Sequence, residues 1–208
     1  MSNDGLPDLP PTAFLKEDGG DDLDFYATAR LVTHIDGSAI AALTGFYRQV
    51  LPASGVILDL MSSWVSHLPA DVTYAEVIGH GMNADELAAN PRLDRWFIQD
   101  LNRNAALPLA DACLDGAMIC VAVQYLQRPA VVLAELARAL KPGAPLVVSF
   151  SNRCFPTKAV RVWLALDDAG QTRLVDLYMR KAGFSEVAVE PLVQGWASDP
   201  LIAVVGRV

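Results

Sequence analysis

Apolar residues in this chain fall either in short continuous runs or at helical spacing. The clearest run covers residues 56–60, where Val, Ile and Leu surround Asp59 before the pattern stops at Met-Ser-Ser. A short apolar run ended by polar residues is typical of a strand buried on both faces. Similar runs predict strands at 72–78, 96–99, 115–123 and 146–150. We expect 187–192 and 202–208 to form an antiparallel pair, because only a loop separates them.

Between these runs, apolar residues recur every three or four positions, which predicts helices at 38–50, 129–140, 157–166 and 171–182. Ser38 is a candidate N-cap, Pro129 suits a first helical turn, and Gly183 suits the position after a helix end. Asn83 and Glu86 resemble a capping box that opens a short helix. Strands alternating with helices predict an α/β fold: a doubly wound, Rossmann-like, seven-stranded and mostly parallel sheet with a C-terminal antiparallel hairpin and helices on both faces.

Residues 1–22 differ from the rest of the chain, because they are acidic, rich in Pro and Gly, and almost free of apolar pattern. We expect them to form a disordered acidic tail. Residues 23–208 are expected to form a single domain, since a chain of 208 residues with 52% hydrophobic content can bury a substantial core.

Charge and composition exclude several classes of function. The net charge is −8 and no dense Lys/Arg run occurs, which argues against nucleic-acid or polybasic membrane binding. The sequence shows no transmembrane run and no signal peptide, so we expect a cytoplasmic protein. Cys113, Cys120 and Cys154 are far apart and predict reduced thiols, and with three scattered histidines they predict no metal site. The oligomeric state stays open, with a homodimer among the alternatives.

Candidate site residues follow the predicted strands. In an open α/β sheet, ligands bind at the carboxyl ends of the strands, so Asp59 marks a small-molecule site. Asp100 follows the strand at 96–99, and Asn152 and Arg153 follow the one at 146–150. Arg153 is a candidate partner for a substrate carboxylate or phosphate.

Three segments together resemble the class I S-adenosylmethionine-dependent methyltransferases: the strand with Asp59, residues 97–100 (Phe-Ile-Gln-Asp), and residues 139–144 (Ala-Leu-Lys-Pro-Gly-Ala). The likeness covers roughly residues 25–208 and is greatest to small type 11-like enzymes, including a subgroup with a Met-Ser-Ser-Trp turn. It implies a cytoplasmic enzyme that transfers a methyl group from S-adenosyl-L-methionine to a small molecule.

The resemblance also implies roles for individual residues. Asp59 would orient the cofactor's ammonium group, and Asp100 would accept a hydrogen bond from the adenine amino group. Residues 61–63 replace a loop that is glycine-rich in the family, and Gly81 stands where a ribose-binding carboxylate is usual, so Asn83 or Asp85 is expected to substitute. The implied cofactor-binding residues are Asp59, Met61, Ser62, Ser63, Gly81, Met82, Asn83, Asp100, Leu101 and Val121. The implied substrate-binding residues are Tyr26, Arg30, His34, Gln124, Tyr125, Asn152 and Arg153, and no catalytic base is identified.

Two alternatives remain open from the sequence. The altered positions at residues 61–63 and Gly81 are compatible with a non-catalytic protein that keeps the fold but has a degenerate cofactor site. Residues 79–84 (Gly-His-Gly-Met-Asn-Ala) satisfy the G-x-G-x-x-A dinucleotide fingerprint, with Asp100 about 20 residues further on, which would suit an NAD(P)-dependent oxidoreductase. Pro91 weakens this second alternative, because it cuts the following helix short.

Overall fold

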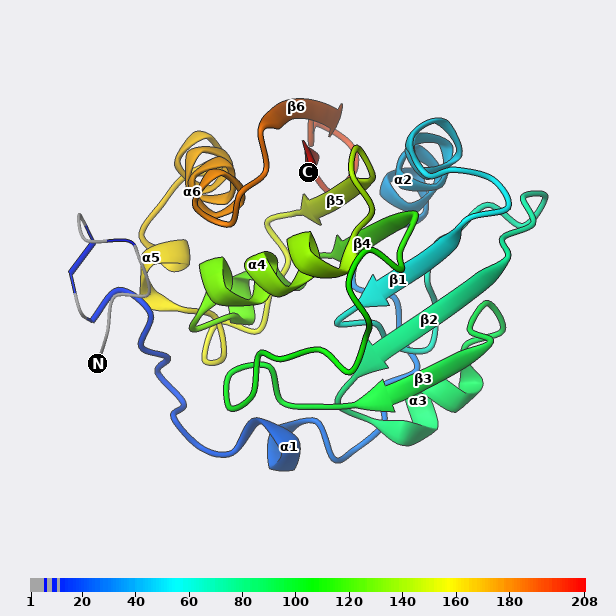
Figure 1. Ribbon diagram of the computed structural model, residues 1–208. Coiled ribbons are helices and arrows are strands. Elements are labelled where there is room, and N and C mark those ends of the chain that lie inside the picture. The colour runs from blue at the N-terminus through cyan, green and yellow to red at the C-terminus, as the bar shows by residue number, and fades with distance from the viewer. Residues whose placement is uncertain (1–5, 7–8, 11) are drawn as a thin grey trace.

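The protein, described here by a computed structural model for residues 6, 9–10 and 12–208, is built on one seven-stranded sheet (Figure 1). The strand order is β3-β2-β1-β4-β5-β7-β6. Strands β1 to β5 run parallel, and β7 runs antiparallel to both β5 and β6. This arrangement confirms the predicted fold class. The strands are β1 (Val56–Leu60), β2 (Glu76–Gly81), β3 (Arg95–Ile98), β4 (Gly116–Cys120), β5 (Pro145–Phe150), β6 (Glu186–Val193) and β7 (Leu201–Arg207).

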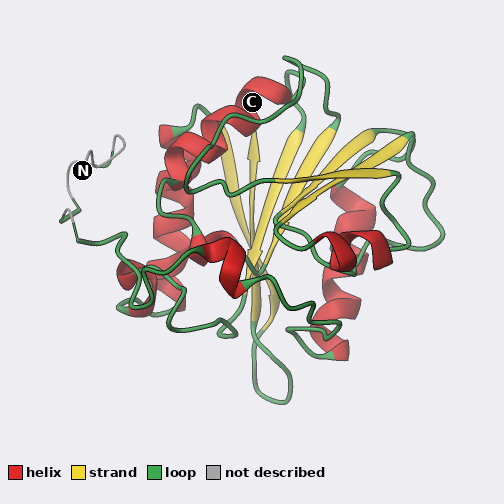
Figure 2. Ribbon diagram, turned by 90° about the horizontal axis from the view of Figure 1, so that it is seen from below, coloured by secondary structure: helices red, strands yellow, loops and turns green. Residues whose placement is uncertain are grey.

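Helices cover both faces of the sheet (Figure 2). Successive residues of a strand point to opposite faces, so β1 contributes to two cores. Ile57 packs with Leu43 of α2 on one face, whereas Leu58 packs with Leu133 of α4 and Val175 of α6 on the other. The helices are α1 (Asp22–Phe25), α2 (Gly37–Val50), α3 (Ala84–Ala89), the 3₁₀ helix η1 (Val123–Tyr125), α4 (Pro129–Ala139), α5 (Arg161–Leu164) and α6 (Asp168–Lys181).

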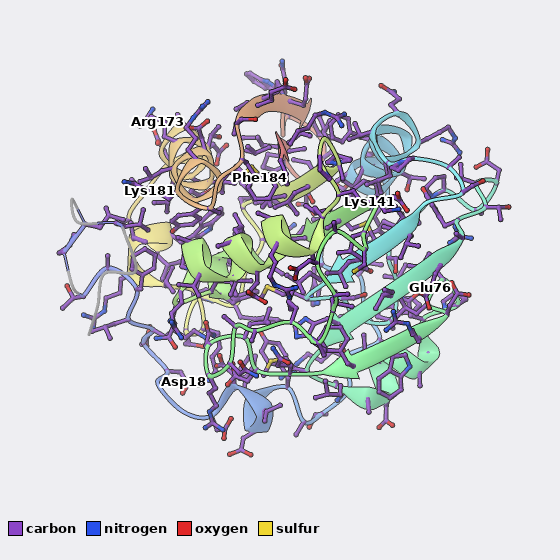
Figure 3. The ribbon with its side chains drawn as sticks, viewed as in Figure 1. Asp18, Glu76, Lys141, Arg173, Lys181 and Phe184 are labelled. Atoms are coloured by element: carbon purple, nitrogen blue, oxygen red, sulfur yellow. The ribbon has the colours of Figure 1, made fainter. Side chains whose placement is uncertain are left out.

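Side chains divide between surface and core as this layering requires. Figure 3 shows Arg173, Lys181 and Glu76 projecting from the periphery, whereas Phe184 points inward. Phe184 is buried in the core cluster that also contains the inner face of α6. The polar faces of the helices therefore cover an apolar interior.

Several local sequence signals are confirmed. Asn83 caps α3 by accepting a hydrogen bond from the Glu86 N–H. Pro129 is the first residue of α4, and Gly183 follows α6 with a φ of +99°, a conformation that glycine adopts without strain. Each of these roles depends only on residues nearby in the sequence, so the sequence alone was enough to predict it.

The second strand differs from its prediction. It begins at Glu76 rather than at residue 72, and it includes residues 79–81, which were expected to form the closing turn. Gly79 lies against the side chain of Leu93, which would have to shift if residue 79 carried a Cβ, because that atom would lie 2.3 Å from Leu93 Cδ1. The glycines of the dinucleotide fingerprint thus lie within a strand, whereas the fingerprint requires them in the turn between strand and helix.

Two helix predictions also need correction. Asp36, not Ser38, caps α2, through a bond from the Ala39 N–H. The helix expected at 157–166 is reduced to the four residues of α5. The first N–H groups of α5, those of Arg161 and Val162, donate to carbonyls of the N-terminal segment. In a longer helix they would donate to carbonyls of the preceding turn.

Residues 1–5, 7–8 and 11 of the expected tail lie outside the described residues. In the described part, residues of this segment contact the rest of the fold. The Lys16 side chain is buried in an ion pair with Asp22, and Ala13 accepts a hydrogen bond from the Val162 N–H. Residues 12–22 therefore pack as part of the fold. None of the helices in the described residues is long and apolar enough to cross a bilayer.

Candidate functional site

A cavity of about 590 Å³ opens at the carboxyl ends of the central strands. Asp59 reaches it from β1, Gly81 from β2, and Val121 from the residue after β4. This is the sheet edge where ligands bind in open α/β folds. All the residues implied as cofactor-binding line this cavity: Asp59, Met61, Ser62, Ser63, Gly81, Met82, Asn83, Asp100, Leu101 and Val121.

Asp59 is a buried carboxylate without a cationic partner among the described residues. It is 2% exposed, and its Oδ2 accepts a hydrogen bond of 2.6 Å from Ser62 Oγ. Burial raises the pKa of Asp59 to about 7, although hydrogen bonds from Ser62 and Ser66 act in the opposite direction. A cation bound beside Asp59 would stabilise the ionised form.

The turn after β1 keeps a glycine-like backbone without glycine. Met61 has a φ of +61°, in the left-handed region that is costly for residues with a Cβ. Its N–H donates to His80 Nδ1 at 3.1 Å, and the Ser62 N–H donates to the His80 carbonyl at 2.6 Å. Val121 also lines the cavity and has a φ of +50°. Strained backbone of this kind is concentrated at functional sites and persists only where neighbouring contacts hold it.

His80 joins three neighbouring strands and stays neutral. Its Nδ1 accepts from Met61, and its Nε2 lies 2.9 Å from the Gln99 carbonyl, which assigns the proton to Nε2. Burial lowers the pKa of His80 to about 4. The sequence placed this histidine in a turn, whereas the structure shows it inside β2 as the side chain that positions the Met61 backbone.

Gly81 cannot be replaced by the carboxylate that is usual at this place in the family. A Cβ at residue 81 would lie 2.7 Å from the Ser62 carbonyl oxygen. One expected substitute, Asp85, is exposed on α3 and does not line the cavity. The backbone of the glycine-free turn therefore occupies the space that a side chain at residue 81 would need.

Asn83, the other expected substitute, lines the cavity but has its amide committed. Its Nδ2 donates to the carbonyls of Tyr26 at 2.9 Å and Ala27 at 3.0 Å. Its Oδ1 accepts from the Glu86 N–H at 3.0 Å. Asn83 thus fixes the N-terminal segment to α3, and its amide groups are already paired.

Glu86 is a cavity carboxylate that the sequence analysis missed. It is 8% exposed; Oε2 accepts from Ser63 Oγ at 2.6 Å, and Oε1 accepts from the Arg30 N–H at 2.7 Å. A capping box would direct this side chain back to the Asn83 N–H. It turns into the cavity instead. The available signal was Gly81, because the family resemblance implies a carboxylate near this position and residue 81 cannot provide one.

Asp100 and Leu101 follow β3 and are both buried at the cavity wall. Asp100 Oδ1 accepts from the Asn102 N–H at 2.9 Å, and Oδ2 lies 3.5 Å from Arg103 Nε. Asp100 therefore caps its own loop and also faces the cavity.

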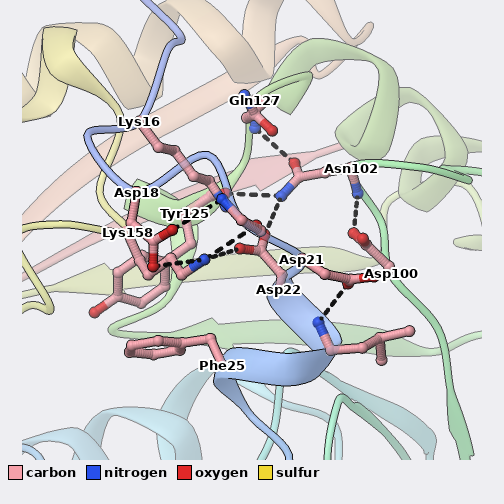
Figure 4. Close-up of polar contacts among 12 residues, drawn as sticks. Lys16, Asp18, Asp21, Asp22, Phe25, Asp100, Asn102, Tyr125, Gln127 and Lys158 are labelled. Carbon is pink, nitrogen blue, oxygen red and sulfur yellow. Dashed lines mark hydrogen bonds and ion pairs between the residues drawn. The ribbon is translucent and has the colours of Figure 1, made fainter.

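A buried charge cluster supports this wall from the N-terminal side. Figure 4 shows Lys16 and Lys158 reaching Asp22 from different segments, with Asn102 beside them. Lys158 Nζ lies 3.1 Å from both Asp22 Oδ1 and Asp18 Oδ2, and Asn102 Nδ2 donates to Asp22 Oδ2 at 3.1 Å. The cluster fixes α1 against the loop after β3 and the segment after β5.

The residues implied as substrate-binding are brought together only in part. Gln124 does not line the cavity: it is 1% exposed and its Nε2 donates to the Val121 carbonyl at 2.8 Å. Asn152 is exposed and also lies outside the lining. Arg153 faces the cavity, but its Nε is paired with Asp199 Oδ1 at 2.8 Å. Those that line the cavity are Tyr26, Arg30, His34, Tyr125 and Arg153.

Besides His80, two more imidazoles line the cavity, those of His34 and His67, and only His34 was predicted from the sequence as a site residue. Burial lowers the pKa of His34, and it lowers that of His67 to about 4. Both rings are therefore neutral near pH 7, and the same burial makes each a weaker base than a free imidazole. The sequence did not indicate that His67 faces the cavity, because its orientation depends on a φ of +53° that no local motif predicts.

The strand order, the antiparallel β7 and a cavity at the carboxyl ends of β1, β2 and β4 define a class I methyltransferase fold. Residues 54–148, which span β1 to β5 and contain Asp59 and Asp100, match the model of a family described as "Methyltransferase domain". This segment of the chain is therefore similar to a methyltransferase domain. No curated protein sequence matches the chain.

Solved structures of the same architecture are similar to this chain at low sequence identity. A possible histamine N-methyltransferase from Thermotoga maritima is 20% identical, with a TM-score of 0.59 over 82% of this chain and 90% of that one. An S-adenosylmethionine-dependent methyltransferase from Mesorhizobium loti is 18% identical, with a TM-score of 0.56 over 83% and 100%. A chain from the complex of the Haloferax volcanii Trm112 activator and a putative methyltransferase is 14% identical, with a TM-score of 0.60 over 81% and 89%. At these identities the likeness establishes the fold.

Proposed function

We propose that this protein is an S-adenosyl-L-methionine-dependent methyltransferase acting on a small molecule. The observation that carries the proposal is the convergence of residues from four strand ends on one cavity, around the buried carboxylate of Asp59. A volume of about 590 Å³ lies within the range of small-molecule and cofactor sites.

The residues present fit the cofactor. A buried carboxylate without a described cationic partner, such as Asp59, suits an ammonium group. Glu86 is the carboxylate available for ribose hydroxyls, in place of a side chain at residue 81. Asp100 and Leu101 would border the adenine ring. The cofactor supplies an electrophilic methyl group on a sulfonium.

The remaining work of the protein is to position the acceptor and exclude water. Methyl transfer requires the acceptor atom in line with the bond that breaks, so orientation accounts for much of the rate. Where the acceptor loses a proton, neutral His34 or His67 would accept it. The hydroxyl of Tyr125 accepts a hydrogen bond of 2.8 Å from the Phe155 N–H, which fixes the position of Tyr125 in the cavity wall.

Thermal denaturation with added ligands tests the proposal. We expect S-adenosylhomocysteine and S-adenosylmethionine to raise the melting temperature, because a ligand that binds the folded state stabilises it. Stabilisation by NAD(P)H alone would favour an oxidoreductase. No effect from any of these ligands would favour a non-catalytic protein.

Glu86→Gln, with Asp85→Asn as its matched control, tests the ribose role. Both variants neutralise a neighbouring carboxylate of α3, but Glu86 faces the cavity and Asp85 faces solvent. We expect Glu86→Gln to weaken S-adenosylhomocysteine binding by about tenfold, in line with the loss of a charged hydrogen-bond acceptor. Asp85→Asn should leave it unchanged. Equal effects of the two variants would contradict the assignment.

A further inference from the structure

The N-terminal wall of the cavity contains an arginine surrounded by aromatic rings. The Arg30 guanidinium carbon lies 4.7 Å from the ring centroid of Phe25, 5.6 Å from that of Phe155 and 5.9 Å from that of Tyr26. Tyr125 extends the same ring cluster, since its ring stacks on Phe155 at 6.1 Å with an interplanar angle of 29°. Three of these rings, Tyr26, Tyr125 and Phe155, line the cavity together with Arg30.

The position of Arg30 is fixed from both ends. Its backbone N–H donates to Glu86 Oε1 at 2.7 Å, and its Nη2 donates to the Phe25 carbonyl at 3.0 Å. Nη1 reaches the Thr28 carbonyl at 3.5 Å. No carboxylate of the described residues forms an ion pair with this guanidinium, although Arg153, the other arginine of the cavity lining, has Asp199 as its partner.

A guanidinium in this setting favours an anion. Cation–π contacts compensate only part of the cost of removing the charge from water, about 0.5–2 kcal/mol each. The planar fork of arginine matches both oxygens of a carboxylate, and such charge-assisted pairs are among the strongest hydrogen bonds. The guanidinium without an ion-pair partner gives this wall a positive potential, whereas Lys158, 5.1 Å from the centroid of Phe25, is already paired with Asp18 and Asp22.

The acidic groups of the cavity do not cancel this potential, because each has its own partners or lies elsewhere. Asp22 is paired with Lys16 and Lys158. Asp199 is paired with Arg153. Asp36 accepts from the Ser198 hydroxyl and from backbone N–H groups. Asp59 and Asp100 line the part of the cavity assigned above to the cofactor. Glu86 also belongs to that part; it contacts Arg30 through the backbone N–H at 2.7 Å and forms no ion pair with the guanidinium.

We propose that Arg30 and the rings of Tyr26, Tyr125 and Phe155 form an acceptor subsite for a planar aromatic carboxylate. The carboxylate pairs with the guanidinium, and the aromatic ring packs among the side chains of the cluster. This assignment rests on the proposed function, in which the other part of the cavity holds the methyl donor.

Three probes of similar size and different charge test the subsite: benzoate, benzamide and benzylamine. Their binding to the full chain is measured by ligand-observed NMR, without cofactor and again with S-adenosylhomocysteine. We expect the wild type to prefer benzoate over benzamide by about tenfold or more, the ratio that a charged hydrogen-bonded pair supplies. Arg30→Gln should abolish the preference. Arg153→Gln, which removes the other cavity arginine, should preserve it.

Arg30→Lys guards against a folding artefact, because lysine retains the charge without the bidentate fork. We expect it to keep part of the benzoate preference. The proposal is overturned if wild type binds benzamide or benzylamine as well as benzoate, if Arg30→Gln keeps the preference, or if Arg30→Lys loses all of it. Failure of S-adenosylhomocysteine to bind would instead refute the proposed function, because the charge preference is measured without it.

Discussion

Replacing Asp59 with a neutral residue should raise the free energy of unfolding in the absence of ligand, and this increase should grow with pH. The folded-state pKa of about 7 lies above the ordinary value of 3.8, so the folded protein holds this proton more tightly than the unfolded chain. Stability is therefore lost as pH rises from about 4 to about 7. The total loss in the free energy of unfolding from ionising Asp59 is on the order of 4 kcal/mol. Roughly 2–3 kcal/mol of this loss occurs between pH 5 and pH 8.

Urea denaturation of wild type and Asp59→Asn at pH 5, 6, 7 and 8 measures this effect. Asparagine still accepts the Ser62 hydroxyl bond, so the variant removes the charge and keeps the packing. His67 and His80 have folded pKa values of about 4, below their ordinary value, so they make stability rise over the lower part of this range. They do so equally in both proteins and cancel in the difference. The reasoning would be refuted if the difference in the free energy of unfolding between wild type and Asp59→Asn stayed constant from pH 5 to pH 8.

Three further predictions concern the turn beside Asp59. Met61→Gly should be more stable than Met61→Ala by about 1 kcal/mol in urea denaturation, because the left-handed φ of +61° favours glycine; the opposite order would show that the turn relaxes. His80→Ala should destabilise the fold by about 2–4 kcal/mol, since it removes both the partner of the Met61 N–H and that of the Gln99 carbonyl. Gly81→Ala should cost about 1–3 kcal/mol and weaken S-adenosylhomocysteine binding, because the new Cβ meets the Ser62 carbonyl at 2.7 Å; unchanged affinity in calorimetry would contradict that close approach.

The fold was predictable because its signals are local and repeated. Apolar runs located the strands, Pro129 began α4, and Asp59 lay at a strand end where a cavity was expected. The errors arose where distant segments compete for the same groups. Residues 157–160 are not helical, because the N-terminal segment accepts the N–H groups of Arg161 and Val162.

Site chemistry was predictable in position but not in detail. The sequence identified many residues of the cavity lining but missed Glu86 and His67. It also could not show that the Asn83 amide is committed to the carbonyls of Tyr26 and Ala27. Nor could it show that Glu86 turns away from its cap to bond Ser63. The first outcome depends on the approach of a segment more than fifty residues earlier in the chain, and the second on a residue 23 positions earlier.

Calorimetric titration with S-adenosylhomocysteine at pH 8 tests the central claim most directly, because it asks whether a glycine-free turn beside Asp59 admits the cofactor. We predict saturable binding to wild type, and affinity at least tenfold lower, above about 1.4 kcal/mol, in Asp59→Asn. No binding to wild type, or equal affinity in the two proteins, would contradict the account.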